Sequence, residues 1–291
     1  MKLGLVLPVF TTDAGRPLGV AERAAGFDGV FAADHVFAPG APDRPAVEVF
    51  TLLAAVAASH PGLGVGVLVT RASMRPVGIL AKLAAGLDHV SGARAVLGLG
   101  LGDRFGRLEH DALGLPYPDI DERAAALEET CVALRSLFSG RSWAGGTHVP
   151  AITGPLLPSA SPPVWVGGAS DRVLAIAARA ADGWNGWGLD AGRFVARVAD
   201  LRRLTADAGR DPDEVEPTWG GIALVGRDAA DLTSLEAGRA EKGLPMDIWR
   251  GTADELGAFA SMLRDAGAGW MIMSAAGPAD RASLIAETLR A

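Results

Sequence analysis

The feature that most constrains the fold is a regular alternation of strand-like and helix-like segments along the whole chain. Short apolar runs bounded by turn residues predict buried strands, at residues 2–8, 28–35, 63–70, 94–98, 163–166, 182–187, 215–225 and 270–274. Apolar residues spaced three to four apart predict helices, at residues 18–26, 46–59, 76–90, 121–139, 170–180, 191–208, 228–242, 252–266 and 279–290. Eight strands that alternate with helices predict a closed (β/α)8 barrel of the α/β class, the TIM barrel.

A doubly wound open sheet is the alternative fold for such a pattern. That fold usually carries a G-x-G-x-x-G turn after its first strand, whereas Pro8-Val9-Phe10 stands there in this chain. Residues 140–161 interrupt the alternation, and their Gly, Ser and Pro content predicts a small surface insertion or hairpin. No internal linker divides the sequence, so residues 1–291 are expected to form a single domain.

Composition excludes several classes of function. The net charge of −7 argues against a nucleic acid as the main partner. Cys131 is the only cysteine, which excludes a disulfide framework, and its place on a helical apolar stripe predicts a buried structural thiol. No metal-ligand motif, P-loop lysine or serine-hydrolase elbow occurs. No run reaches the ~20 apolar residues that span a bilayer, so a cytoplasmic protein without membrane contact is expected.

The second predicted strand ends in Asp34-His35, and the carboxyl ends of strands are where α/β folds bind ligands. One interpretation is that Asp34 braces a loop or caps a helix beside a partly exposed histidine. The other is that His35 exchanges a proton with a ligand, while Asp34 orients it or binds a polar group.

Glycines mark three further places near strand ends. Gly64 and Gly66 predict either a bulge and close backbone approach, or packing of a helix on the strand. The run 97–103 has the spacing G-x-G-x-G and suits contact between backbone and a flat ring, with the acids Asp103 and Glu109 nearby. Gly167-Gly168 before a helix predicts a phosphate site, or alternatively a tight turn with Ser170 as the N-cap.

Taken in order, these segments resemble the luciferase-like flavin-dependent oxidoreductases, in particular the branch that uses the deazaflavin coenzyme F420. The ordered set carries the resemblance, rather than any one motif, and it covers most of the chain. The match is weakest between about residues 225 and 250. The matching stretches are residues 26–30 with Asp34-His35, 63–67, 75–76, 81–82, 87–94, 97–100 with Glu109 and Gly114, 166–170 and 181–184.

The resemblance implies a barrel with an insertion after its fourth or fifth strand, and a cofactor over its C-terminal mouth. It also implies a non-proline cis peptide at Gly66–Val67, against the cofactor ring. His35 and one acid, Asp103 or Glu109, would face the reacting carbon. The implied cofactor-binding residues are Asp34, Gly66, Val67, Gly100, Leu101, Gly102, Gly167, Gly168, Ala169 and Ser170.

We therefore expect an oxidoreductase that transfers a hydride between coenzyme F420 (an 8-hydroxy-5-deazaflavin), or FMN as the alternative, and a small organic substrate. The loop at 36–40 lacks the tryptophan found in the sugar-phosphate dehydrogenases of this family, which disfavours a sugar phosphate. Two other functions stay open: a reduced-FMN-dependent monooxygenase and a non-catalytic flavin-binding barrel. The resemblance is also consistent with a homodimer.

Overall fold

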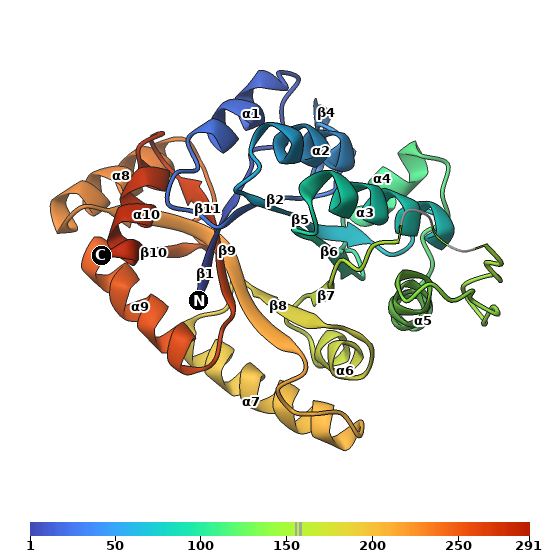
Figure 1. Cartoon of the computed structure of the whole chain (residues 1–291). Coiled ribbons are helices and arrows are strands. Elements are labelled where there is room, and N and C mark those ends of the chain that lie inside the picture. Colours follow the sequence, from blue (N-terminus) through green and yellow to red (C-terminus); the bar gives the residue numbers. More distant parts are fainter. Residues whose placement is uncertain (155, 157–158) are drawn as a thin grey trace.

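The structure is a computed structural model that describes residues 1–154, 156 and 159–291, and in these residues eight parallel strands close into a barrel. Each barrel strand pairs with the next, and the last pairs with the first, which completes the ring (Figure 1). The predicted (β/α)8 barrel is confirmed. The strands are β1 (Lys2–Val6), β2 (Gly29–Ala32), β5 (Gly64–Arg71), β6 (Ala95–Gly100), β7 (Val164–Gly167), β8 (Gly183–Trp187), β9 (Glu216–Gly226) and β11 (Trp270–Ala276).

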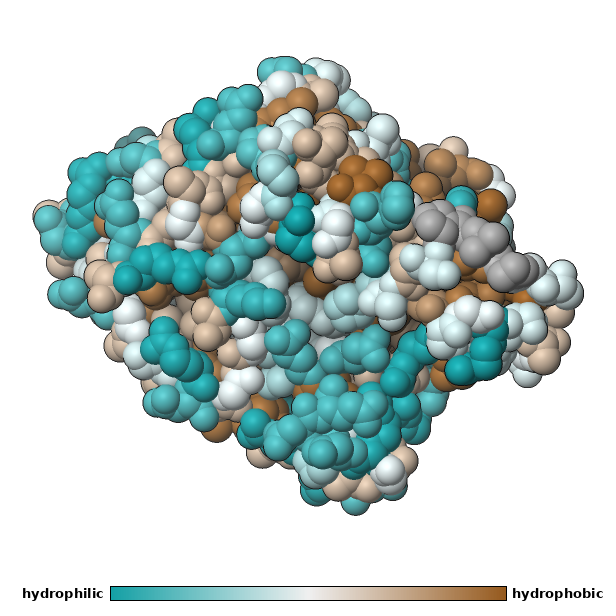
Figure 2. Space-filling view, in the orientation of Figure 1, coloured by the Kyte–Doolittle hydropathy of each residue, from teal (hydrophilic) through white to brown (hydrophobic). Residues whose placement is uncertain are grey.

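Helices surround the barrel and cover the outward faces of its strands (Figure 1). They form where the apolar spacing predicts them, with bounds that differ by a few residues. Over most of the face drawn in Figure 2 the surface is polar or neutral, with separate hydrophobic areas. The helices are α1 (Gly15–Glu22), α2 (Val49–Ser59), α3 (Val77–Ser91), α5 (Ile120–Phe138), α6 (Asp171–Ala180), α7 (Ala191–Asp207), α8 (Ala229–Glu241), α9 (Ala253–Asp265) and α10 (Arg281–Arg290).

Side chains alternate between two apolar layers, as the strand period of two requires. In β2, Val30 and Ala32 belong to the layer between barrel and helices, whereas Phe31 points into the barrel. There Phe31 contacts Trp165 and Trp270, with ring centroids 6.0 and 5.2 Å away. The barrel interior is therefore a packed aromatic core rather than a channel.

The structure adds four short elements that the apolar periodicity does not predict. The strands β3 (Phe37–Ala38) and β4 (Ala41–Pro45) form a hairpin after β2, and α4 (Gly106–Ala112) follows β6. β10 (Trp249–Thr252) pairs with β9 outside the closed ring. Each is too short to show a clear period. The strand predicted at 28–35 is also shorter than expected and ends at Ala32.

The interruption at residues 140–161 contains a small hairpin, in which Trp143 pairs with Ile152. It follows α5 and thus lies after the fourth barrel strand, as the resemblance implies. Residues 155, 157 and 158 of this predicted insertion lie outside the described residues. None of the helices that the structure describes is long and apolar enough to cross a bilayer.

The non-proline cis peptide joins Leu68 and Val69, so the expectation of Gly66–Val67 is wrong by two residues. Gly66 lies in the regular part of β5, paired with Phe31 and Val96. The register shifts only after Val67, and Leu68 and Val69 then both face the barrel interior. Position 66 requires a glycine for a different reason, because a Cβ there would come within 2.4 Å of the Phe31 ring.

Candidate active site

A cavity of about 470 Å³ lies at one rim of the barrel, where the carboxyl ends of β2, β5, β6, β7 and β8 meet. It brings together residues that are as far apart in sequence as 34 and 187. The predicted site residues that line it are Asp34, His35, Gly100, Leu101, Gly102, Asp103, Gly167, Gly168, Ala169 and Ser170. Gly66, Val67 and Glu109 do not line it.

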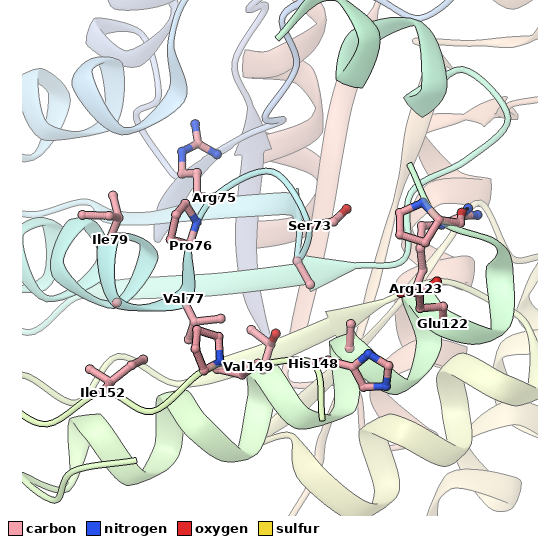
Figure 3. A pocket seen from close by; sticks show the side chains of 16 residues that line it. Ser73, Arg75, Pro76, Val77, Ile79, Glu122, Arg123, His148, Val149 and Ile152 are labelled. Carbon is pink, nitrogen blue, oxygen red and sulfur yellow. Dashed lines mark hydrogen bonds between the residues drawn. The ribbon is translucent and has the colours of Figure 1, made fainter. Parts of the chain in front are cut away.

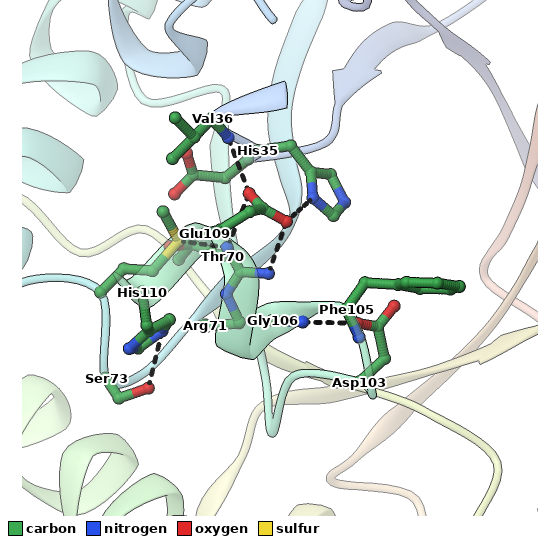
Figure 4. Close-up of polar contacts among 12 residues, drawn as sticks. His35, Val36, Thr70, Arg71, Ser73, Asp103, Phe105, Gly106, Glu109 and His110 are labelled. Atoms are coloured by element: carbon green, nitrogen blue, oxygen red, sulfur yellow. Dashed lines mark hydrogen bonds and ion pairs between the residues drawn. The ribbon is translucent and has the colours of Figure 1, made fainter. Parts of the chain in front are cut away.

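The imidazole of His35 lies at the wall of this cavity and is held from behind by Glu109 (Figure 4). Nδ1 of His35 lies 2.8 Å from Oε1 of Glu109, and the His35 side chain is 18% exposed while that of Glu109 is fully buried. The backbone N–H of Val36 donates to the other carboxylate oxygen, at 2.7 Å. Because α4 carries Glu109 to the back of His35, the acid contacts the histidine rather than the cavity.

Glu109 also forms a bidentate ion pair with Arg71, which lies at the end of β5. Nη1 of Arg71 lies 3.1 Å from Oε1, and Nη2 lies 2.9 Å from Oε2. Burial by itself would raise the pKa of Glu109, but the hydrogen bonds from His35, Arg71 and Val36 lower that pKa to about 2. Glu109 is therefore an anion throughout the physiological range.

Arg71 is a site residue that the sequence reasoning missed. It follows Thr70 at the end of the third predicted strand, so the argument that singled out Asp34-His35 applies to it equally. Its Nη atoms bind Glu109, and Nη2 also lies 3.2 Å from the sulfur of Met74. Its Nε is buried without a partner among the described residues.

Asp34 is buried beside the cavity and forms a separate ion pair with Arg75, from the loop after β5. Both Nη atoms of Arg75 contact the Asp34 carboxylate, with Nη2 3.2 Å from Oδ1. Arg75 also reaches Oε1 of Glu48 at 3.3 Å and Oγ1 of Thr70 at 3.3 Å. The interpretation of Asp34 as a residue that braces this loop is thus supported by its contacts.

Asp103 lies at the cavity but turns back to its own loop. Its Oδ1 accepts hydrogen bonds from the backbone N–H groups of Phe105 and Gly106, at 2.9 and 3.1 Å. Its main-chain oxygen accepts from the hydroxyl of Tyr117, at 2.6 Å. Asp103 therefore orders the loop between β6 and α4.

Glycines let three strands meet at the floor of the cavity. A Cβ at Gly100 or at Gly167 would come within 2.8 Å of the Val69 side chain, so only glycine allows Val69 to lie between them. Gly168 has φ +138°, a conformation that favours glycine. The hydroxyl of Ser170 accepts from the N–H of Val173, which confirms the N-cap at the start of α6.

These features fit a flat, partly polar group. The floor offers backbone and apolar side chains for a planar ring, and the N-terminus of α6 lies beside it for an anionic tail. The unpartnered Nε of the cavity-lining Arg71 is a donor that an acceptor atom could satisfy. Trp187 is 40% exposed and lines the cavity, whereas Trp184 is buried and stacks on Phe194.

A second cavity, of about 490 Å³, lies between the loop after β5, α5 and the hairpin at 140–161 (Figure 3). Its walls are largely apolar, with Val77, Ile79 and Ile152 among the residues labelled in Figure 3. Its arginines already have partners: Arg75 binds Asp34, and Arg123 donates to the main-chain oxygen of Leu101.

Cys131 lies on α5, away from both cavities. Its side chain is fully buried in the layer between barrel and helices, as predicted. Burial raises the pKa of the thiol far above its ordinary value. Cys131 is therefore a packing residue and not a nucleophile.

The fold is a TIM barrel whose C-terminal rim carries a cavity beside a carboxylate-held histidine. The sequence model of luciferase-like monooxygenases matches residues 13–283. The chain therefore belongs to the luciferase-like family.

Individual relatives span a range of reactions. An uncharacterised protein of Mycobacterium tuberculosis is 28% identical over 213 residues, which cover 67% of this chain and 72% of the relative. An F420-dependent secondary alcohol dehydrogenase superposes with a TM-score of 0.84, at 15% identity over 100% of this chain and 99% of the other. EDTA monooxygenase from Chelativorans sp. BNC1 superposes with a TM-score of 0.82, at 17% identity over 99% and 92%. The two structural likenesses show a shared fold, and it is the family match that supports an enzyme of the oxidoreductase and monooxygenase type.

Proposed function

We propose that this protein is an oxidoreductase that transfers a hydride between a deazaflavin cofactor, or FMN as the alternative, and a small organic substrate. The observation that carries the proposal is the cavity-facing imidazole of His35, whose Nδ1 is held by buried Glu109. Interconversion of an alcohol and a carbonyl moves a proton as well as a hydride, and a histidine held in this way can take or give that proton.

The proposed cofactor site is the glycine-lined floor of the rim cavity. Gly100, Leu101 and Gly102 would contact the ring through their backbone, and the segment from Gly167 to Ser170 would hold the phosphate at the N-terminus of α6. When bound, the ring supplies the atom that accepts or donates the hydride. The protein contributes the binding surface, the orientation and the proton carrier.

We assign different roles to the two candidate acids. Glu109 is fully buried behind His35, so it orients the imidazole and stabilises its protonated form. Asp103 lies at the cavity and orders the loop before α4 through its hydrogen bonds. In this proposal His35 is the residue that touches the substrate, and Gly66 and Val67 have no part in cofactor binding.

The deazaflavin is preferred because the F420-dependent alcohol dehydrogenase shares the barrel over its whole length and its name states an alcohol reaction. An alcohol reaction moves a hydride and a proton, and His35 is placed to carry the proton. The likeness to EDTA monooxygenase makes a reduced-FMN-dependent monooxygenase the second candidate. We also propose that residues 1–291 form one domain, because β1 and β11 join the two ends of the chain in one barrel.

Binding and turnover should separate these functions. We expect F420 to bind more tightly than FMN, measured by fluorescence titration, and to be reduced by one or more members of a panel of secondary alcohols. His35→Ala should keep F420 affinity and lower turnover at least about 100-fold, because the proton carrier is lost. His89→Ala, at an exposed position of α3, is the matched control and should change neither.

The contrary results are distinct. Tight FMN binding with substrate-dependent O₂ consumption would identify a monooxygenase instead. Binding of neither cofactor, or unchanged turnover in His35→Ala, would contradict the proposal.

A further inference from the structure

We propose that Arg71 is a positioning residue that fixes the proton of neutral His35 on Nδ1, and so makes Nε2 the atom through which His35 exchanges protons. Arg71 acts through Glu109 and does not itself contact His35. The inference concerns the same site as the proposed function, but it can be tested on the protein without cofactor.

The hydrogen bonds at Glu109 leave no place for a proton on its carboxyl group. Oε1 lies 2.8 Å from Nδ1 of His35 and accepts from Nη1 of Arg71 at 3.1 Å. Oε2 receives the N–H of Val36 at 2.7 Å and Nη2 of Arg71 at 2.9 Å. Arginine and backbone N–H groups are donors only, so a protonated carboxyl would face donors on both oxygens. Glu109 is thus an acceptor, and Nδ1 of His35 must be the donor.

A neutral imidazole carries one proton. With that proton on Nδ1, the other nitrogen, Nε2, holds a lone pair and can accept a proton from a ligand hydroxyl. When His35 is protonated, Nε2 becomes a donor and the imidazolium is stabilised by the adjacent Glu109 anion. The same atom therefore serves both directions of a reaction between an alcohol and a carbonyl.

Arg71 is needed because a lone buried anion would change the charge state of His35. The Arg71 side chain is 5% exposed and that of Glu109 is fully buried, so water screens this pair weakly. Arg71 balances the Glu109 charge, which leaves His35 able to exist as the neutral base. Without Arg71, the uncompensated carboxylate would keep His35 protonated to higher pH.

The other groups that face His35 are already balanced or uncharged. Asp34, the preceding residue, is paired with Arg75. Asp103 shares the cavity, and its carboxylate accepts two backbone N–H groups of its own loop. The ring of Phe10, from the loop after β1, lies 5.6 Å from the imidazole centroid. Glu109 and Arg71 are therefore the pair that sets the state of Nδ1.

The test is NMR of the cofactor-free protein with ¹⁵N-labelled histidine, followed through a pH titration. We expect wild-type His35 to be protonated on Nδ1 in its neutral form. In Glu109→Gln the proton should move at least in part to Nε2, because an amide no longer requires a donor there. In Arg71→Met the pKa of His35 should rise by about one unit or more, and Arg71→Lys should restore part of the difference.

His60 provides the internal reference. Its Nδ1 lies 3.2 Å from the main-chain oxygen of Val56 at the end of α2, so its signals should not change in any of these variants. A wild-type His35 protonated on Nε2 would overturn the proposal without any variant. So would an Arg71→Met protein that folds and titrates at His35 like the wild type. Neither result depends on turnover. The NMR test of Arg71 can therefore fail or succeed independently of the cofactor-binding and turnover test of the proposed function.

Discussion

At the scale of single residues, the charge of Glu109 dominates the site. Burial favours the neutral acid, but four donors hold the carboxylate as an anion and lower its pKa to about 2 from an ordinary value of 4.5. The folded protein therefore binds a proton at Glu109 less readily than the unfolded chain. This difference contributes stability that is fully present above pH 4.5 and is lost as the pH falls toward 2.

Glu109→Gln should remove this part of the acid dependence. Wild-type protein should lose on the order of 3 kcal/mol more unfolding free energy than the variant between pH 5 and pH 2, measured by urea unfolding at several pH values. Glu22→Gln, which removes an exposed carboxylate from α1, serves as the control and should follow the wild type. An identical acid dependence in Glu109→Gln and wild type would show that the buried carboxylate is not held as an anion.

At the scale of elements, helix caps connect the barrel rim to the helices behind it. Ser170 caps α6 by accepting from the N–H of Val173, and Asp190 caps α7 by accepting from the N–H of Arg193 at 2.9 Å. The two caps are alike in their bonding, but only Ser170 lines the rim cavity. Variants of the two caps can therefore separate an effect on folding stability from an effect on cofactor binding.

Ser170→Ala and Asp190→Ala should each lower the unfolding free energy by about 1 kcal/mol, because each leaves a first-turn N–H without its acceptor. Only Ser170→Ala should also weaken F420 or FMN binding, measured by fluorescence titration at a temperature where both variants are folded. Equal loss of cofactor affinity in both variants would mean that the α6 N-terminus has no direct role in binding.

At the scale of the whole molecule, the barrel closes around a cluster of three aromatic side chains. Phe31 contacts Trp165 and Trp270, whose own ring centroids are 6.3 Å apart, and a Cβ at Gly66 would come within 2.4 Å of the Phe31 ring. Because both tryptophans pack against the Phe31 ring, it has little room to move aside. The glycine is a requirement of barrel packing.

Gly66→Ala should destabilise the protein by about 1–3 kcal/mol through overpacking, seen as a lower urea midpoint. Gly257→Ala is the matched control, because Gly257 lies inside α9 with open space around it and should gain up to about 1 kcal/mol. If Gly66→Ala were as stable as the wild type, the aromatic core would have to be looser than the structure describes.

The apolar patterns predicted nearly all of the barrel, because strand and helix periods are local properties of the chain. The helix at 121–139 is observed as Ile120–Phe138, and the strand at 270–274 as Trp270–Ala276. The elements that the patterns missed were short, such as α4. The cis peptide at Leu68–Val69 lies where the register of β5 against β6 shifts, two residues from the position that the resemblance implied.

The sequence by itself determined the (β/α)8 fold and the presence of Asp34, His35 and the glycine-rich turns at strand ends. Only the tertiary structure decided which acid serves His35, because Glu109 is 74 residues away along the chain and reaches it through α4. The same is true of Arg71, which is 38 residues from Glu109. Hydrophobic periodicity specifies the elements one by one, whereas the contacts that set charge and proton position arise when the strands of the barrel meet at its rim.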